Sequence, residues 1–217
     1  MTAVMGPEHE ARATMLRMTS VDSPARARSS AATSRGLDQP LHPSVTGSIV
    51  GLVGGSLFML ANRGALPGPW PMLALVAWVV LAAATVWAVF LARRGLPELP
   101  APHPRAGMVY GLAMLGMVAL FLLSRPLSLL LSQVADQEPA AIQPALIVLA
   151  VGAHFLPFAG VFHAPVFGRL GAALCLLALA GAGLAAIFGA PWGAATAVAA
   201  GAVMLGALVI AALRPGR

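Results

Sequence analysis

The chain has 217 residues, of which 59% are hydrophobic and only 9% are charged. A soluble globular domain carries about 25% charged residues, so this composition excludes an ordinary soluble enzyme and a disordered protein. All 13 Lys-plus-Arg positions are arginine, and the eight that follow residue 43 lie at the ends of apolar blocks, which favours topology signals over nucleic-acid contacts. The composition predicts a multi-pass membrane protein that has the lipid bilayer as its partner and no nucleic acid. The arginine bias, with abundant Ala, Gly and Pro, is typical of a GC-rich bacterial coding sequence, so we expect a bacterial plasma membrane.

Residues 1–43 form a separate segment that is rich in Ala, Arg, Ser and Pro and has no apolar period. Such a segment cannot bury enough apolar surface to fold, so we predict a disordered cytoplasmic tail. Two interpretations of the tail are open. Either its arginines contact anionic lipid, or translation starts at Met15 or Met18.

From residue 44 onward the chain consists of apolar blocks, each near the 20 or so residues that a spanning helix needs. We predict an all-α fold, a transmembrane bundle of six helices within residues 44–213. The predicted helices cover residues 44–61, 71–92, 107–124, 142–162, 170–188 and 192–213. The last two share one apolar stretch, which the sequence GAPW at 189–192 divides. Arg125 and Pro126 end the third helix in this prediction, although the apolar residues 127–134 either lengthen it or lie in the outer interface.

The arginines near the helix ends are divided unequally between the two sides of this topology. Nine of them fall on the side that carries both chain ends, whereas Arg63 and Arg125 fall on the other side. Because arginine-rich short loops stay in the cytoplasm, we predict that both termini are cytoplasmic.

Small residues recur at a spacing of four in several predicted helices. These stripes comprise Gly47, Gly51 and Gly55; Gly107 and Gly111; Gly181 and Ala185; and Gly193, Ala197 and Gly201. Small residues let helix backbones approach closely in lipid. We expect the stripes to pack helices inside one bundle, and a homo-oligomer held through them is the alternative.

His154 is the one Asp, Glu, Lys, Arg or His residue inside the six predicted helices. An ionisable side chain at membrane depth is a functional candidate because its burial is costly. Pro157 cannot donate a backbone hydrogen bond, so we expect a kink that frees a carbonyl beside the imidazole. One interpretation is a ligand-binding site formed by His154, Pro157 and Phe158. The other is a neutral imidazole that is hydrogen-bonded to a neighbouring helix.

Arg125, at the predicted outer end of the third helix, is the second candidate. Its guanidinium either snorkels to the lipid headgroups or pairs with Asp136 or Glu138 across the following loop. In the second arrangement Gln143 joins the cluster, and the cluster forms a polar ligand-binding site.

The most distinctive segment of the chain is GAHFLPF at residues 152–158. It resembles a G-A-H-F-x-P-aromatic signature of a family of small bacterial multi-helix membrane proteins with a domain of unknown function. The segment FHAPVF at 162–167 is similar to the aromatic-rich short loop that follows in that family. The resemblance implies a helical membrane domain, brings no catalytic residue, substrate or cofactor with it, and ranks His154 and Pro157 above the other candidates.

Motifs of enzymes and metal sites do not occur in the sequence, which has no nucleophile elbow, P-loop or metal-ligand spacing. His163 follows His154 by nine residues and so falls on the opposite face of an ideal helix. We therefore expect no enzyme, no metal and no cofactor. The favoured function is an integral membrane protein that binds or moves a small solute near the His154–Pro157 kink. The alternative is a structural or accessory membrane subunit that acts through helix–helix contacts.

Overall fold

The computed structural model describes residues 43–92 and 103–214, so the predicted disordered tail, apart from its last residue, lies outside the described residues. Six long helices make up most of the described chain, and no strand occurs in these two ranges. The helices are α3 (Pro43–Asn62), α4 (Trp70–Val86), α5 (Ala106–Ala135), α6 (Pro139–Val161), α7 (Pro165–Phe188) and α8 (Ala190–Leu213). A 3-10 turn, η1 (Arg63–Ala65), follows α3, and a π-helical segment, η2 (Trp87–Ala92), continues α4. The predicted all-α bundle of six helices is confirmed.

Five of these helices are long and apolar enough to cross a membrane, namely α4 with its π-helical extension and α5 to α8. Their outer surfaces are apolar. On α5, for example, Leu115 and Leu122 are 66% and 70% exposed. A continuous apolar surface of this extent is unfavourable in water but favourable in lipid. The helical backbone also suits the bilayer, because its N–H and C=O groups are hydrogen-bonded within each helix.

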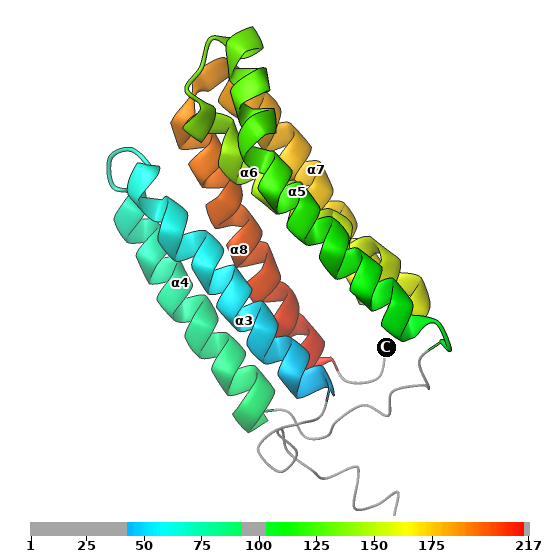
Figure 1. Ribbon diagram of the computed structural model, residues 1–217. Helices are drawn as coiled ribbons and strands as arrows, with labels where there is room; N and C mark the ends of the chain where they lie inside the picture. The colour runs from blue at the N-terminus through cyan, green and yellow to red at the C-terminus, as the bar shows by residue number, and fades with distance from the viewer. Residues whose placement is uncertain (1–42, 93–102, 215–217) are drawn as a thin grey trace, which may run out of the picture.

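The bundle is organised around α8, which packs against α3 and α4 on one side and against α6 and α7 on the other. Helix α5 packs mainly on α6. Figure 1 shows the resulting arrangement, with the α3–α4 pair separated from the α5–α6–α7 group except through α8. The start of α3 and the end of α8 lie at the same end of the bundle (Figure 1), because six successive helices run alternately in opposite directions.

Glycines on α3 and α8 set the close approach of α8 to α3 and to α6. A Cβ on Gly201 of α8 would lie 2.5 Å from the carbonyl oxygen of Gly55 on α3, and a Cβ on Gly193 would overlap the carbonyl oxygen of Ala141 on α6. These positions admit only glycine without moving a backbone. The expectation that the glycine stripes pack helices inside the bundle is therefore confirmed for α3 and α8.

Helix α5 does not end where the sequence predicted. It continues through Arg125 and Pro126 to Ala135, so the end at residue 124 is wrong, and of the two alternatives for residues 127–134 the lengthened helix is the one observed. Proline removes one backbone donor, but transmembrane helices tolerate it where other groups satisfy the backbone. Ser124 and Ser128, which are buried on either side of Pro126, donate hydrogen bonds to the carbonyl oxygens of Phe121 and Arg125, at distances of 2.6 and 2.8 Å. The carbonyl that Pro126 leaves without a helical donor is that of Leu122, and neither serine donates to it.

Helices α6 and α7 begin earlier than predicted. They start at Pro139 and Pro165, ahead of the predicted residues 142 and 170. Proline is favoured in the first helical turn because its missing N–H has no helical partner there in any case. The turns that precede α6 and α7 contain residues with left-handed backbones, Asp136 (φ 52°) and His163 (φ 50°).

Candidate functional site

His154 lies in the lower half of α6 within a group of aromatic rings. Its imidazole packs edge-on against Phe158, with ring centroids 4.6 Å apart, and lies 5.4 Å from the ring of Phe155. Phe158 is buried, and it also stacks on Tyr110 of α5 at 5.7 Å. Phe155 stacks on Phe167 of α7 at 6.1 Å. Edge-to-face and offset-stacked pairs of this kind hold their members in fixed orientations, so the cluster joins α5, α6 and α7 around the histidine.

The sequence left open that the His154 imidazole is hydrogen-bonded to a neighbouring helix, and among the described residues the structure does not show this bond at Nδ1. Its Nδ1 atom is buried and has no hydrogen-bond partner within the described part of the chain. A buried polar atom without a partner costs about 1–3 kcal/mol. The predicted bond to a neighbouring helix is therefore not formed at Nδ1 among the described residues, and this atom is one that a ligand could satisfy.

Residues on either side of His154 fix the local backbone. The chain remains α-helical through Pro157 to Val161, although Pro157 cannot donate to the carbonyl of Ala153. Gly152 brings α7 close, because a Cβ there would lie 2.9 Å from the backbone nitrogen and the Sγ of Cys175. The Gly152 position thus determines how closely α6 and α7 pack at the level of the histidine.

Arg125 and Gln143 form a second polar group, on α5 and α6. The Nη1 atom of Arg125 donates to Oε1 of Gln143 at 3.5 Å. The predicted ion pair of Arg125 with Asp136 or Glu138 is absent from residues 43–92 and 103–214, so that part of the prediction is wrong. The physical reason is the continuation of α5, because the eleven residues from Arg125 to Asp136 extend about 16 Å along the helix axis.

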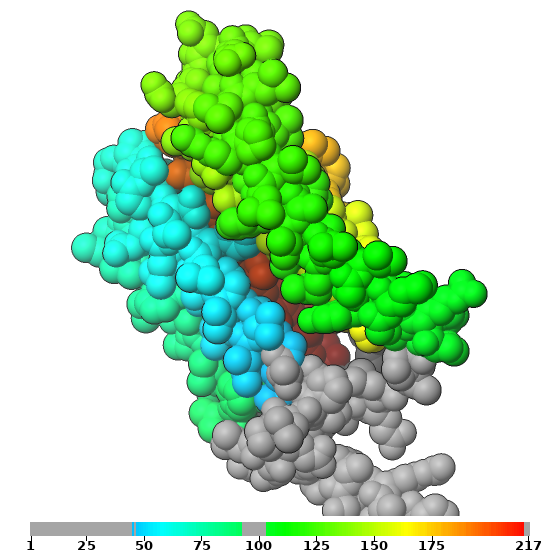
Figure 2. Space-filling model, viewed as in Figure 1, coloured from blue at the N-terminus to red at the C-terminus, as the bar shows by residue number. Residues whose placement is uncertain are grey.

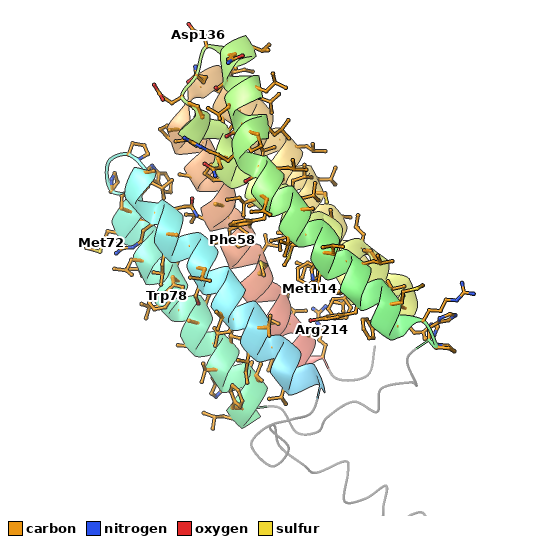
Figure 3. The ribbon with its side chains drawn as sticks, viewed as in Figure 1. Phe58, Met72, Trp78, Met114, Asp136 and Arg214 are labelled. Atoms are coloured by element: carbon orange, nitrogen blue, oxygen red, sulfur yellow. The ribbon has the colours of Figure 1, made fainter. Side chains whose placement is uncertain are left out.

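The predicted site residues therefore fall into two places. Gln143 and His154 are eleven residues apart on α6, which separates them by about 16 Å. Arg125 and Gln143 lie toward the end of the bundle where Figure 3 places Asp136, whereas His154, Pro157 and Phe158 lie toward the end where it places Arg214.

A groove of about 650 Å³ lies between α3, α5 and α6, and sequence reasoning missed it. Of the predicted site residues only Gln143 is part of its lining. Figure 2 shows the hollow between α3 and α5, with α8 visible behind it. The groove is lined by Gly54, Leu57, Phe58, Ala61 and Asn62 of α3; Met117, Val118, Phe121 and Leu122 of α5; and Ala140, Gln143, Pro144, Ile147 and Val151 of α6. Figure 3 shows Phe58 on the side of α3 that faces this hollow. Its volume is within the range of small-molecule sites, about 300–1,000 Å³.

The ends of the groove differ in polarity. Gln143 and Asn62 are the polar residues of its lining, and Asn62 is the last residue of α3. Val151 is the last lining residue on α6, and His154 follows it by three residues on the same helical face. The groove thus has a polar end beside Arg125 and an apolar length that leads toward the His154 cluster.

The fold and its apolar exterior define the chain as a multi-pass α-helical membrane protein. No protein-family model matches it, and searches of curated proteins and of solved structures find no significant match. The resemblance of residues 152–158 to a G-A-H-F-x-P family stays a prediction. No group of three or more His, Cys, Asp or Glu residues suited to a metal occurs in the described ranges.

Proposed function

We propose that this membrane protein binds a small apolar or amphiphilic molecule inside the bilayer, in the groove between α3, α5 and α6. The observation that carries the proposal is the groove itself, about 650 Å³ in volume and lined almost entirely by apolar side chains. Sites of this kind, between the helices of a bundle and with few polar groups, are typical places for small-molecule ligands.

The proposal keeps the solute-binding hypothesis of the sequence but moves the site. The rings of Phe155 and Phe158 pack against the imidazole of His154 and leave little room for a ligand there. The main volume for a ligand lies in the groove, closer to the start of α6. His154 lies one helical turn beyond Val151, the last lining residue on α6, so a polar group of the ligand would reach its buried Nδ1 atom only if the rings around it move. Helices α3 and α5 have few contacts with each other, so the groove is open to the bilayer between them.

A tryptophan that fills the groove tests this function. Val118 lines the groove from α5, whereas Val134 on the same helix lies outside it and is 85% exposed. The protein is purified in native lipid, and the molecules that remain bound are extracted and identified by mass spectrometry. We expect the wild type and Val134→Trp to retain the same molecule and Val118→Trp to lose it. Equal retention by all three proteins would contradict the proposal.

The accessory-subunit alternative is favoured by a different feature. At Gly107 and Gly111 of α5, no described atom lies within 4 Å of the place that a Cβ would occupy, so this small-residue pair is open to a second chain. An accessory subunit or homo-oligomer would therefore use the outer face of α5. A partner that co-purifies with the wild type and is lost with Gly111→Leu would support this alternative.

We also propose a bacterial plasma membrane as the location, with both termini in the cytoplasm. The composition, with arginine as its only Lys-or-Arg residue and abundant Ala, Gly and Pro, supports the bacterial location. The unequal distribution of arginine, together with the position of both ends of the described bundle on one side (Figure 1), supports the orientation.

A further inference from the structure

We propose that the molecule in the groove is a lipid with an anionic phosphate headgroup, which binds Arg125 while one acyl chain lies in the groove. The inference rests on the proposed function and names its ligand class. Two observations lead to it. Arg125 has no carboxylate partner among the described residues, and it lies beside Gln143 at the polar end of an otherwise apolar groove.

Arg125 carries a positive charge that the described residues do not neutralise. Its side chain donates a hydrogen bond to the neutral amide oxygen of Gln143, at 3.5 Å. A guanidinium has five N–H donors, so most of its donors remain free for a ligand. An arginine in or near the hydrocarbon region is costly unless an anion or water reaches it. A phosphate suits it because two guanidinium N–H groups can bind two phosphate oxygens in parallel.

The neighbours of Arg125 extend this polar end. Gln143, which accepts the Arg125 bond, itself lines the groove, and its amide N–H₂ group can donate to a headgroup. Asn62 faces the groove from α3, and Arg63 follows it directly in the chain. The local charge from Arg63 and Arg125 is positive, whereas the nearest acid along α6, Glu138, lies five residues before Gln143, or about 8 Å along the helix axis.

The shape of the groove selects a lipid over a free phosphate ion. Below Gln143 the α6 lining continues through Ile147 to Val151, about 12 Å along the axis, and offers only apolar surface. Inorganic phosphate would gain nothing from this surface, whereas an acyl chain would exchange lipid contacts for protein contacts there. The groove also opens sideways between α3 and α5 (Figure 2), so a chain can enter it from the bilayer.

The test uses the full chain in nanodiscs that contain equal amounts of phosphatidylglycerol and phosphatidylcholine. Lipids that stay bound after release into mild detergent are counted by native mass spectrometry. We expect the wild type to retain phosphatidylglycerol in preference to phosphatidylcholine. Arg125→Gln should lower the retention of phosphatidylglycerol by about tenfold, since a hydrogen bond to a charged group is worth about one factor of ten or more. It should also reduce the preference over phosphatidylcholine, because the cationic choline of that lipid is repelled by the Arg125 charge that the variant lacks. Arg169→Gln, an exposed arginine at the other end of the bundle, is the matched control and should keep the preference.

The outcomes separate the two proposals. An unchanged preference in Arg125→Gln, together with loss of all retained lipid in Val118→Trp, would overturn the headgroup assignment and leave groove binding intact. Lipid retention that neither variant alters would overturn both. Competition by inorganic phosphate would identify a phosphate-ion site and overturn the lipid assignment. Arg125→Lys, which keeps the charge but loses the planar fork, should restore part of the preference, and equal thermal stability of the variants checks that each is folded.

Discussion

Replacing Gly193 with alanine tests the close contact between α6 and α8. A Cβ at Gly193 would overlap the carbonyl oxygen of Ala141, and both positions belong to helix backbones. No side-chain rotation can relieve this overlap, so α8 must move away from α6. The shift would disturb the small core beside it, where Ala141, Ile142 and Ala185 are fully buried.

The magnitude follows from two opposing effects. Overpacking of a close contact costs about 1–3 kcal/mol. Alanine is a better helix former than glycine by up to about 1 kcal/mol. The expected net loss is roughly 1–2 kcal/mol, which for a chain of this size lowers Tm by roughly 2–8 °C.

The control is Gly206→Ala on the same helix. Among the described residues, nothing lies within 4 Å of a Cβ at Gly206, so this variant should keep or slightly raise the stability. Thermal unfolding of the purified proteins in mild detergent, followed by circular dichroism, measures both. If Gly193→Ala is as stable as Gly206→Ala, the α6–α8 contact described above is not the packing in the membrane.

The topology, the histidine and the outer face of α5 each give a further prediction. Reporter fusions after Arg94 and Arg217 should read as cytoplasmic and a fusion at Gln137 as external; an external reading at Arg217 would refute the six-helix topology. His154→Phe should insert and fold normally, because it keeps the ring contacts and removes an unpaired polar atom, but it should weaken ligand retention. A fully active and stable variant would refute the site. If His154→Phe unfolds while His154→Gln stays stable, the histidine makes a structural hydrogen bond. Gly111→Leu should leave Tm unchanged, because that position faces open space among the described residues. A lower Tm would show that α5 packs differently. Loss of an oligomer in light scattering would locate a subunit interface at this position.

The site illustrates why single residues could be found in the sequence but their arrangement could not. His154 was recognisable because an ionisable side chain within an apolar block is expensive and therefore rare. The other rings of its cluster include Tyr110 and Phe167, which come from two other helices, and no spacing along the chain brings them to it. Arg125 and its neighbour Gln143 were recognised too, but the expected ion pair with Asp136 or Glu138 was wrong because the helix was expected to end at Pro126.

The sequence by itself determined the class of protein and the number of helices. The bilayer interior leaves a chain few alternatives, because each crossing needs about 20 apolar residues and every backbone group must be satisfied within a helix. Block lengths and interrupting Gly-Pro signals are therefore sufficient to count the helices. The end of α5 escaped this reasoning because the helix continues through Pro126, between the hydrogen-bonded serines Ser124 and Ser128.

Only the tertiary structure decided which helices touch and which leave a groove. Gly55, Gly193 and Gly201 draw α3 and α6 onto α8, and this arrangement leaves α3 and α5 apart on one face of the bundle. Apolar surface is equally compatible with lipid and with another helix, so the hydrophobic pattern carries no preference between these neighbours. The choice depends on the fit of backbones and side chains across helices that are distant in the chain, and the groove beside Arg125 and Gln143 is its consequence.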